Sequence, residues 1–164
     1  MVLLVQYTLI FASVLALVAL GGCFSEHSGV INIGLEGIMV MGALGGALAM
    51  KFLPASTPGI VLFILIVLAS VVVGMVFSQL LGFAAIHFNA DQTLVGTALN
   101  LMGTAAAVVI VRAINVAENP DNVSSTVVYR QAKQVFLVKI GDFEFNWFML
   151  IIVLAIIASH IVLY

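Results

Sequence analysis

The chain has 164 residues, of which 64% are hydrophobic and 7% are charged, and its formal net charge is −2. A soluble domain carries roughly 25% charged residues to cover its surface. The low charged fraction of this chain, together with its mean hydropathy of +1.31, excludes a water-soluble globular fold. The few basic residues form no patch, which argues against nucleic acid as a partner. In lipid the backbone must satisfy its hydrogen bonds internally, and uniformly apolar runs of about 20 residues predict membrane-spanning helices rather than barrel strands.

The first two apolar runs are separated by a short polar stretch, Ser25–Ser28. The runs Val2–Gly22 and Val30–Phe52 are each long enough to span a bilayer. The second run carries Asn32 and Glu36 in its first turns, among several glycines. Irregular backbone at membrane depth is tolerated only where protein buries it or where it lines a cavity. This pattern predicts a helix start that is partly unwound or re-entrant.

The third run, Ile60–Phe88, is longer than the hydrocarbon core requires. Pro54 and Pro58 precede it and predict a tight turn, because proline is tolerated at helix ends rather than inside helices. We expect this long helix to tilt, to protrude or to break, with Gly74 or Gly82 as the points of a break.

The fourth run, Thr93–Ala113, follows a short polar turn at 89–92 in which Asp91 is the expected N-cap. After it comes a hydrophilic segment, Asn115–Glu144, in which two short strands are expected. These strands are Val127–Tyr129 and Val135–Ile140.

The fifth apolar run, Phe145–Tyr164, begins with aromatic residues of the kind that gather at membrane interfaces. The fold class is therefore all-α, a polytopic membrane protein with about five transmembrane helices. The chain ends just as this run is complete, which predicts a fragment or a truncated gene product.

Small residues recur at helical spacing in two of the predicted spans. The second span contains Gly42 and Gly46, four residues apart, and the fourth places Gly96, Asn100 and Gly103 on one stripe. Small residues let membrane helices approach closely. The stripe therefore predicts helix–helix contact, with a lining of a substrate path as the alternative.

Glu36 is the one carboxylate inside a predicted span near its start, with Asn32 one helical turn earlier. Charged residues within membranes usually face a bundle interior or water and often mark function. A structural role, direct solute contact and simple solvation near the interface all remain open for Glu36.

Residues for catalysis or metal binding do not assemble in this sequence. His27, His87 and His160 are far apart, the single cysteine is Cys23, and no nucleophile–histidine–acid set or phosphate-binding glycine loop is present. We therefore expect no metal site and no enzymatic activity on this chain.

Two stretches resemble a known family. Residues 24–37 read FSEHSGVINIGLEG, followed by IMVMGALGGALA, and residues 89–101 read NADQTLVGTALNL. Both look like permease subunits of bacterial ABC importers, in the group of branched-chain amino acid, ribose and nucleoside systems. The subgroup for simple sugars and nucleosides is the most similar, and the resemblance covers about the N-terminal half of such a permease.

The resemblance implies a transmembrane permease, residues 1–164, in the bacterial cytoplasmic membrane, importing a nucleoside or simple sugar or, less readily, a branched-chain amino acid. It implies a second permease subunit, cytoplasmic ATPase subunits and an extracytoplasmic solute-binding protein as partners. ATP and Mg²⁺ would bind the ATPase, with no cofactor on this chain. By position, residues 28–37 match a glycine-rich stretch that lies near the family's translocation pathway for the solute. Residues 91–100 match the start of a span that lines this translocation pathway. The substrate-pathway candidates are Asn32, Glu36, Asp91, Gln92 and Asn100.

Two features depart from the family pattern. The chain stops at Tyr164, before the basic cytoplasmic loop that docks on the ATPase, so we expect no coupling to ATP hydrolysis without the rest of the permease. All five Lys/Arg lie at or beyond the turns on one side, which the positive-inside rule would place in the cytoplasm. The resemblance instead makes residues 115–144 an extracytoplasmic loop, and we follow it. A small helical subunit of a membrane redox complex is the alternative function, supported only by the number of spans.

Overall fold

The computed structural model describes residues 2–54, 56–128, 137–140, 143–146, 152–154, 156–159 and 161. They belong to two compact units, which are treated separately: Met1–Ser28 with Ala132–Tyr164, and Gly29–Gln131. Four helices in the described residues are long and apolar enough to cross a membrane. They correspond to the first four predicted spans and confirm the helical membrane fold.

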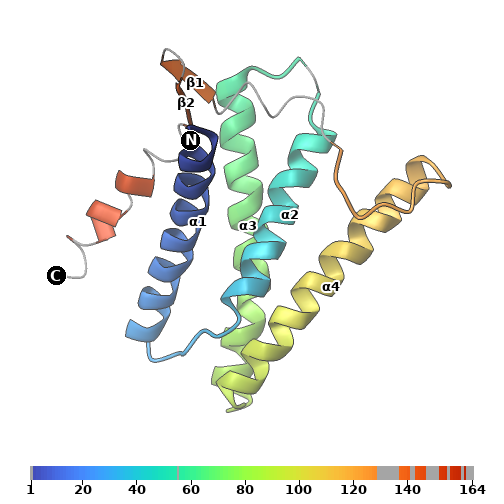
Figure 1. The fold of residues 1–164 in the computed structure, drawn as a ribbon. Coiled ribbons are helices and arrows are strands. Elements are labelled where there is room, and N and C mark those ends of the chain that lie inside the picture. The colour runs from blue at the N-terminus through green and yellow to red at the C-terminus, as the bar shows by residue number, and fades with distance from the viewer. Residues whose placement is uncertain are drawn as a thin grey trace. The chain divides into compact units, whose positions relative to one another are not determined.

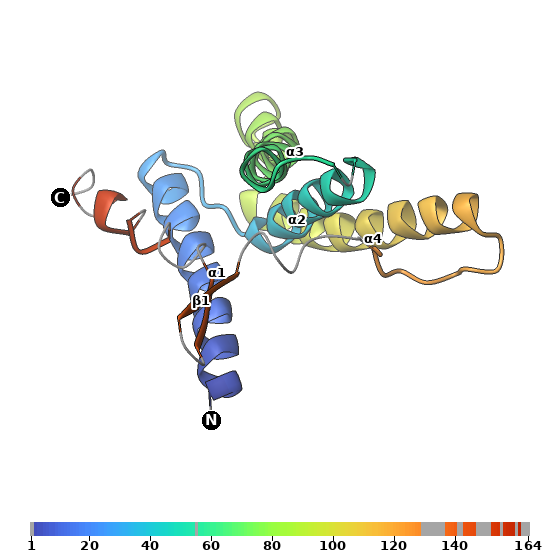
Figure 2. The ribbon, with the colours of Figure 1, turned by 90° about the horizontal axis from the view of Figure 1, so that it is seen from above.

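The unit Gly29–Gln131 contains three of these helices, α2 (Leu35–Phe52), α3 (Gly59–His87) and α4 (Gln92–Glu118). Helix α2 packs against both α3 and α4 (Figure 1), and the view from above shows the same neighbours (Figure 2). A small apolar core forms where the three helices meet. Its buried members are Phe77, Leu81 and Leu99.

Helix α2 contacts α3 through glycines. A β-carbon on Gly45 would lie 2.9 Å from the carbonyl oxygen of Ala69 and 2.7 Å from Cγ2 of Val73. A β-carbon on Gly42 would lie 3.3 Å from the carbonyl oxygen of Ser70. The absence of side chains at these positions therefore permits the close approach of the two helices, as small residues do in membrane proteins.

Helix α3 runs unbroken for 29 residues, past Gly74 and Gly82. At 1.5 Å per residue it is about 44 Å long, against a hydrocarbon core of about 30 Å. Of the three predicted outcomes, a break is therefore wrong, and tilt or protrusion accommodates the extra length. The turn before α3 is tight as predicted, with the amide of Thr57 donating to the carbonyl of Pro54 at 3.1 Å.

Helix α4 ends at Glu118, so it extends beyond the predicted limit at Ala113. The polar segment predicted to begin at Asn115 therefore starts as helix, because Asn115 and Glu118 both contact Lys51 of α2, which stabilises this last turn. Val127 and Val128 are not in a strand, so the first predicted strand is wrong for its described residues.

The other unit contains α1 (Val2–His27) and a hairpin of β1 (Leu137–Ile140) and β2 (Phe143–Asn146). The strands pair antiparallel, with Lys139 opposite Glu144. Strand β1 confirms the end of the second predicted strand. The predicted start of the fifth span at Phe145 is wrong, because apolar and polar residues alternate over 143–146 with the period of a strand. Most of that predicted span lies outside the described residues.

Candidate functional site

The backbone is not helical over residues 29–34, immediately before α2. Gly29 has a φ of +84°, in the left-handed region that favours glycine. Gly34 is the N-cap of α2 and offers no side chain to accept from the first amides of the helix. The first amides of a helix have no partner within the helix and need one from outside. The unwound start that the glycines predicted is therefore present, and α2 needs a capping group from elsewhere.

Asn100 of α4 supplies this cap. Its Oδ1 accepts from the amide of Gly37 at 2.8 Å. Its Nδ2 donates to the carbonyl of Ile33 at 2.9 Å. An amide group presents a donor and an acceptor side by side, so Asn100 satisfies one backbone group on each side of the point where α2 begins.

The first residues of α4 have two separate tasks. The side chain of Gln92 accepts from the amide of Ile31 at 2.7 Å, which adds a second tie between α4 and the unwound segment. Asp91 is the N-cap of α4, as predicted, and one of its oxygens accepts from the amides of Thr93 and Leu94 at 2.8 and 3.2 Å. Its negative charge also lies at the positive end of the helix dipole.

Glycines bring the start of α2 into backbone contact with the first half of α4. A β-carbon on Gly96 would lie 2.9 Å from the backbone nitrogen of Gly34. A β-carbon on Gly103 would lie 2.8 Å from both Cα and the carbonyl oxygen of Gly37. This contact places Asn100, which lies between Gly96 and Gly103 on the same stripe, within reach of the backbone of α2.

Asn32 and Glu36 differ from the other candidate residues. Oδ1 of Asn32 is buried and has no hydrogen-bond partner in the described part of the chain. Glu36 is exposed in the first turn of α2 and makes no hydrogen bond or ion pair with the residues that the structure describes. The side chains of Asp91, Gln92 and Asn100 are engaged with backbone, whereas Asn32 and Glu36 keep unused polar atoms close to the same turn.

A second polar cluster lies at the opposite ends of α2 and α4. Lys51 Nζ is 2.9 Å from Oε2 of Glu118 and donates to Oδ1 of Asn115 at 3.2 Å. This cluster was not predicted from the sequence, because Asn115 and Glu118 were expected in a polar loop. The available signal was helical spacing: 115 and 118 are three residues apart and therefore share one side of a helix.

The histidines serve local structure where they are described. Nδ1 of His27 lies 2.9 Å from the carbonyl of Cys23, and the ring of His87 stacks on that of Phe83 at 4.4 Å between centroids. Among the residues that the structure describes, no three His, Cys, Asp or Glu side chains come together as metal ligands. His160 lies outside the described residues.

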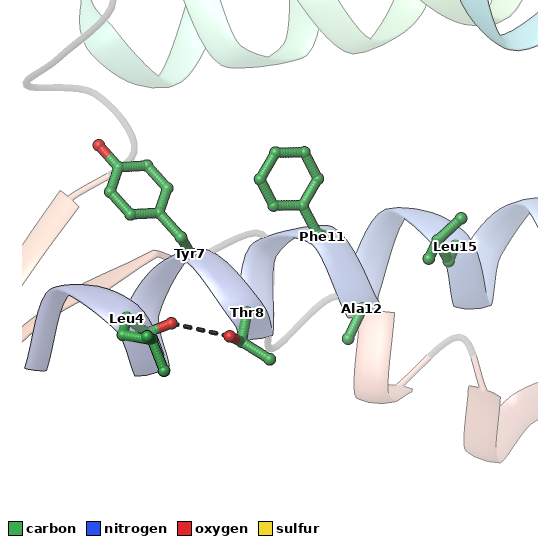
Figure 3. A pocket seen from close by; sticks show the side chains of 6 residues that line it. All are labelled: Leu4, Tyr7, Thr8, Phe11, Ala12 and Leu15. Carbon is green, nitrogen blue, oxygen red and sulfur yellow. Dashed lines mark hydrogen bonds between the residues drawn. The ribbon is translucent and has the colours of Figure 1, made fainter. Parts of the chain in front are cut away.

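Helix α1 presents a shallow, mostly apolar surface (Figure 3). Leu4, Tyr7, Phe11 and Leu15 on it are more than half exposed. The hydroxyl of Thr8 is already engaged, donating to the carbonyl of Leu4 at 2.8 Å. A surface of this kind suits lipid or another apolar helix, not chemistry.

The fold and this site define a polytopic membrane protein with a glycine-rich, unwound helix start held by a neighbouring span. The family model described as "Branched-chain amino acid transport system / permease component" matches residues 4–164. The chain belongs to this family of membrane permeases, and with its long apolar helices it is a multi-pass protein of the cytoplasmic membrane.

Two curated relatives are similar in sequence to this chain. The guanosine ABC transporter permease protein NupQ of Bacillus subtilis is 44% identical over 116 residues, which cover 68% of this chain and 35% of the relative. The nucleoside ABC transporter permease protein NupC of Lactococcus lactis is 34% identical over 110 residues, covering 67% and 34%. The chain thus spans about a third of the length of these relatives. No solved structure matches it.

Proposed function

We propose that this chain is part of the permease subunit of an ATP-driven importer that moves nucleosides, with simple sugars as the next class and branched-chain amino acids after them. The observation that carries the proposal is the family match over residues 4–164, together with the two relatives whose names specify guanosine and nucleosides. ATP and Mg²⁺ then bind separate cytoplasmic ATPase subunits. A second permease subunit, identical or related, and an extracytoplasmic solute-binding protein complete the importer.

Within the site, Asn32 and Glu36 are the proposed solute contacts. A buried acceptor without a donor costs roughly 1–3 kcal/mol, so Oδ1 of Asn32 gains from a hydroxyl or amino group of a solute once movement of the unwound segment exposes this oxygen. Nucleosides and sugars both carry such donors. Asn100, Gln92 and Asp91 have their polar atoms on backbone groups, and their proposed role is to hold the unwound segment in place.

We also propose that the polar segment 115–144 faces the outside. The ammonium of Lys51 is paired with Glu118 and its side chain is only 9% exposed. A buried, paired lysine is a weak topological signal compared with a free cation in a loop. This pairing reduces the weight of the positive-inside count and supports the orientation implied by the family.

Uptake of tritiated guanosine by cells that express the complete permease and its partners tests the proposal. We expect Asn32→Ala to lower uptake without lowering the thermal stability of the purified permease, because the substitution removes an acceptor that had no partner. Glu36→Gln should also lower uptake, whereas Glu26→Gln, a matched change at an exposed glutamate of α1, should not. Wild-type uptake in both Asn32→Ala and Glu36→Gln would refute the proposed contacts, and absence of any nucleoside or sugar uptake would refute the substrate class.

A further inference from the structure

The polar cluster at the C-terminal ends of α2 and α4 joins three separate parts of the chain. Asn115 is 2% exposed. Its Oδ1 accepts from Lys51, while its Nδ2 donates to the carbonyls of Ser124 at 2.9 Å and Thr126 at 3.0 Å. One buried side chain thus connects α2, α4 and the segment that follows α4, and both of its N–H donors are used.

Lys51 and Glu118 supply the charges of this cluster. The lysine side chain is 9% exposed and the glutamate side chain is 57% exposed. The ammonium is therefore withdrawn from water, and the two oxygens it contacts, on Glu118 and Asn115, replace its hydration. Glu118 contributes its charge from the solvent-accessible side, so it can be changed without removing a buried side chain.

The two ends of the α2–α4 pair are held by different means. At the N-terminal end of α2 its backbone touches that of α4 through Gly37 and Gly103, the latter near the middle of α4. In Figure 1 the two helices lie together at the start of α2 and separate toward their C-terminal ends. There the glycines of α2 contact α3 instead, as Gly45 does, and the long side chain of Lys51 reaches across to α4.

We propose that Lys51, Asn115 and Glu118 form a charge-dependent lock that sets the separation of the C-terminal ends of α2 and α4. The same lock positions residues 122–126 against α4. Lys51 is the buried partner of this pair, whereas Glu118 is 57% exposed. Loss of the Glu118 charge alone leaves a buried ammonium uncompensated, which is destabilising, whereas removal of both charges is often neutral. The uncompensated ammonium separates the helix ends to reach water, so loss of the negative charge at Glu118 releases the lock, and loss of both charges leaves no ammonium to hydrate.

The lock has a consequence for transport that rests on the proposed function. In a permease that alternates between outward and inward access, α2 and α4 move as one body, because they are tied at both ends. The conformational change then occurs at other contacts of these helices.

Distances between spin labels, measured in the complete permease in lipid nanodiscs, test the lock without requiring transport. The labels are attached to Phe52→Cys at the end of α2 and Ser125→Cys in the segment after α4, both exposed positions, with Cys23 and every other cysteine of the complete permease replaced by Ser. We expect a narrow distance distribution in the parent protein. Glu118→Gln should broaden it and shift it to longer distances, and Lys51→Met combined with Glu118→Gln should restore it.

Two further variants on α4 serve as a control and as a second test of the lock. Arg112→Gln removes an exposed cation one turn before Asn115 on α4 and should leave the distribution unchanged. Asn115→Leu should broaden it even with both charges present. Glu118→Gln could reduce the yield of folded permease too far for labelling. In that case a recovered yield in the double variant supports the lock, and an unrecovered yield refutes the lock. An unchanged distribution in Glu118→Gln, or equal broadening in the single and double variants, would also refute it.

Discussion

Gly103→Ala tests the backbone contact between α4 and α2. The new β-carbon would lie 2.8 Å from both Cα and the carbonyl oxygen of Gly37. Both atoms belong to backbone, so no side-chain rotation relieves the clash and α2 must shift away from α4. Overpacking of this kind costs about 1–3 kcal/mol.

The shift also affects the cap formed by Asn100. Its bonds to Gly37 and Ile33 are 2.8 and 2.9 Å long, and a net hydrogen bond contributes about 0.5–1.5 kcal/mol. Alanine gains at most about 1 kcal/mol over glycine as a helix former. The expected outcome is a net loss of about 2 kcal/mol in stability, because the clash and the strained cap together exceed the gain in helix propensity.

Gly82→Ala is the matched control for this measurement. A β-carbon on Gly82 meets nothing within 4 Å, so only the gain in helix propensity applies. Thermal unfolding of the two variants in detergent, followed by size-exclusion chromatography, should show a lower midpoint for Gly103→Ala and an unchanged or higher midpoint for Gly82→Ala. Equal midpoints would show that the two helices do not approach as closely as the structure indicates.

Three further predictions concern single residues. Asn100→Asp should lower stability by about 2 kcal/mol, since a carboxylate still accepts from Gly37 but faces the Ile33 carbonyl without a proton to donate; a midpoint equal to that of the parent protein would contradict the cap. Asp91→Ala should cost about 1 kcal/mol through loss of the N-cap of α4, and a second substitution, Asp91→Ser, should restore most of it if capping is the reason. A cysteine at the exposed Ser124 should react with a membrane-impermeant maleimide in intact cells; labelling only after the cytoplasm is opened would reverse the proposed orientation.

The roles within the candidate site were only partly visible in the sequence. The glycines around Asn32 and Glu36 predicted the unwound start of α2, and the position of Asp91 predicted its cap. The stripe containing Asn100 predicted contact or a pathway without deciding between them. The structure shows that Asn100 binds the backbone of residues 33 and 37. These partners are more than sixty residues away in the chain, so no local sequence pattern could reveal this role of Asn100.

The sequence by itself determined that this protein lies in a lipid bilayer and where its first four spans are. The length of an apolar run is a local property of the sequence, and it must match the thickness of the hydrocarbon core. Only the tertiary structure decided which polar groups are satisfied. Asn115 and Glu118 were predicted to lie in a loop, but α4 extends through both residues, and both contact Lys51. Conversely, Asn32 keeps a buried oxygen without a partner in the described part of the chain. The physical reason is that hydrogen bonding and charge pairing depend on distances between helices, and helix packing alone sets those distances.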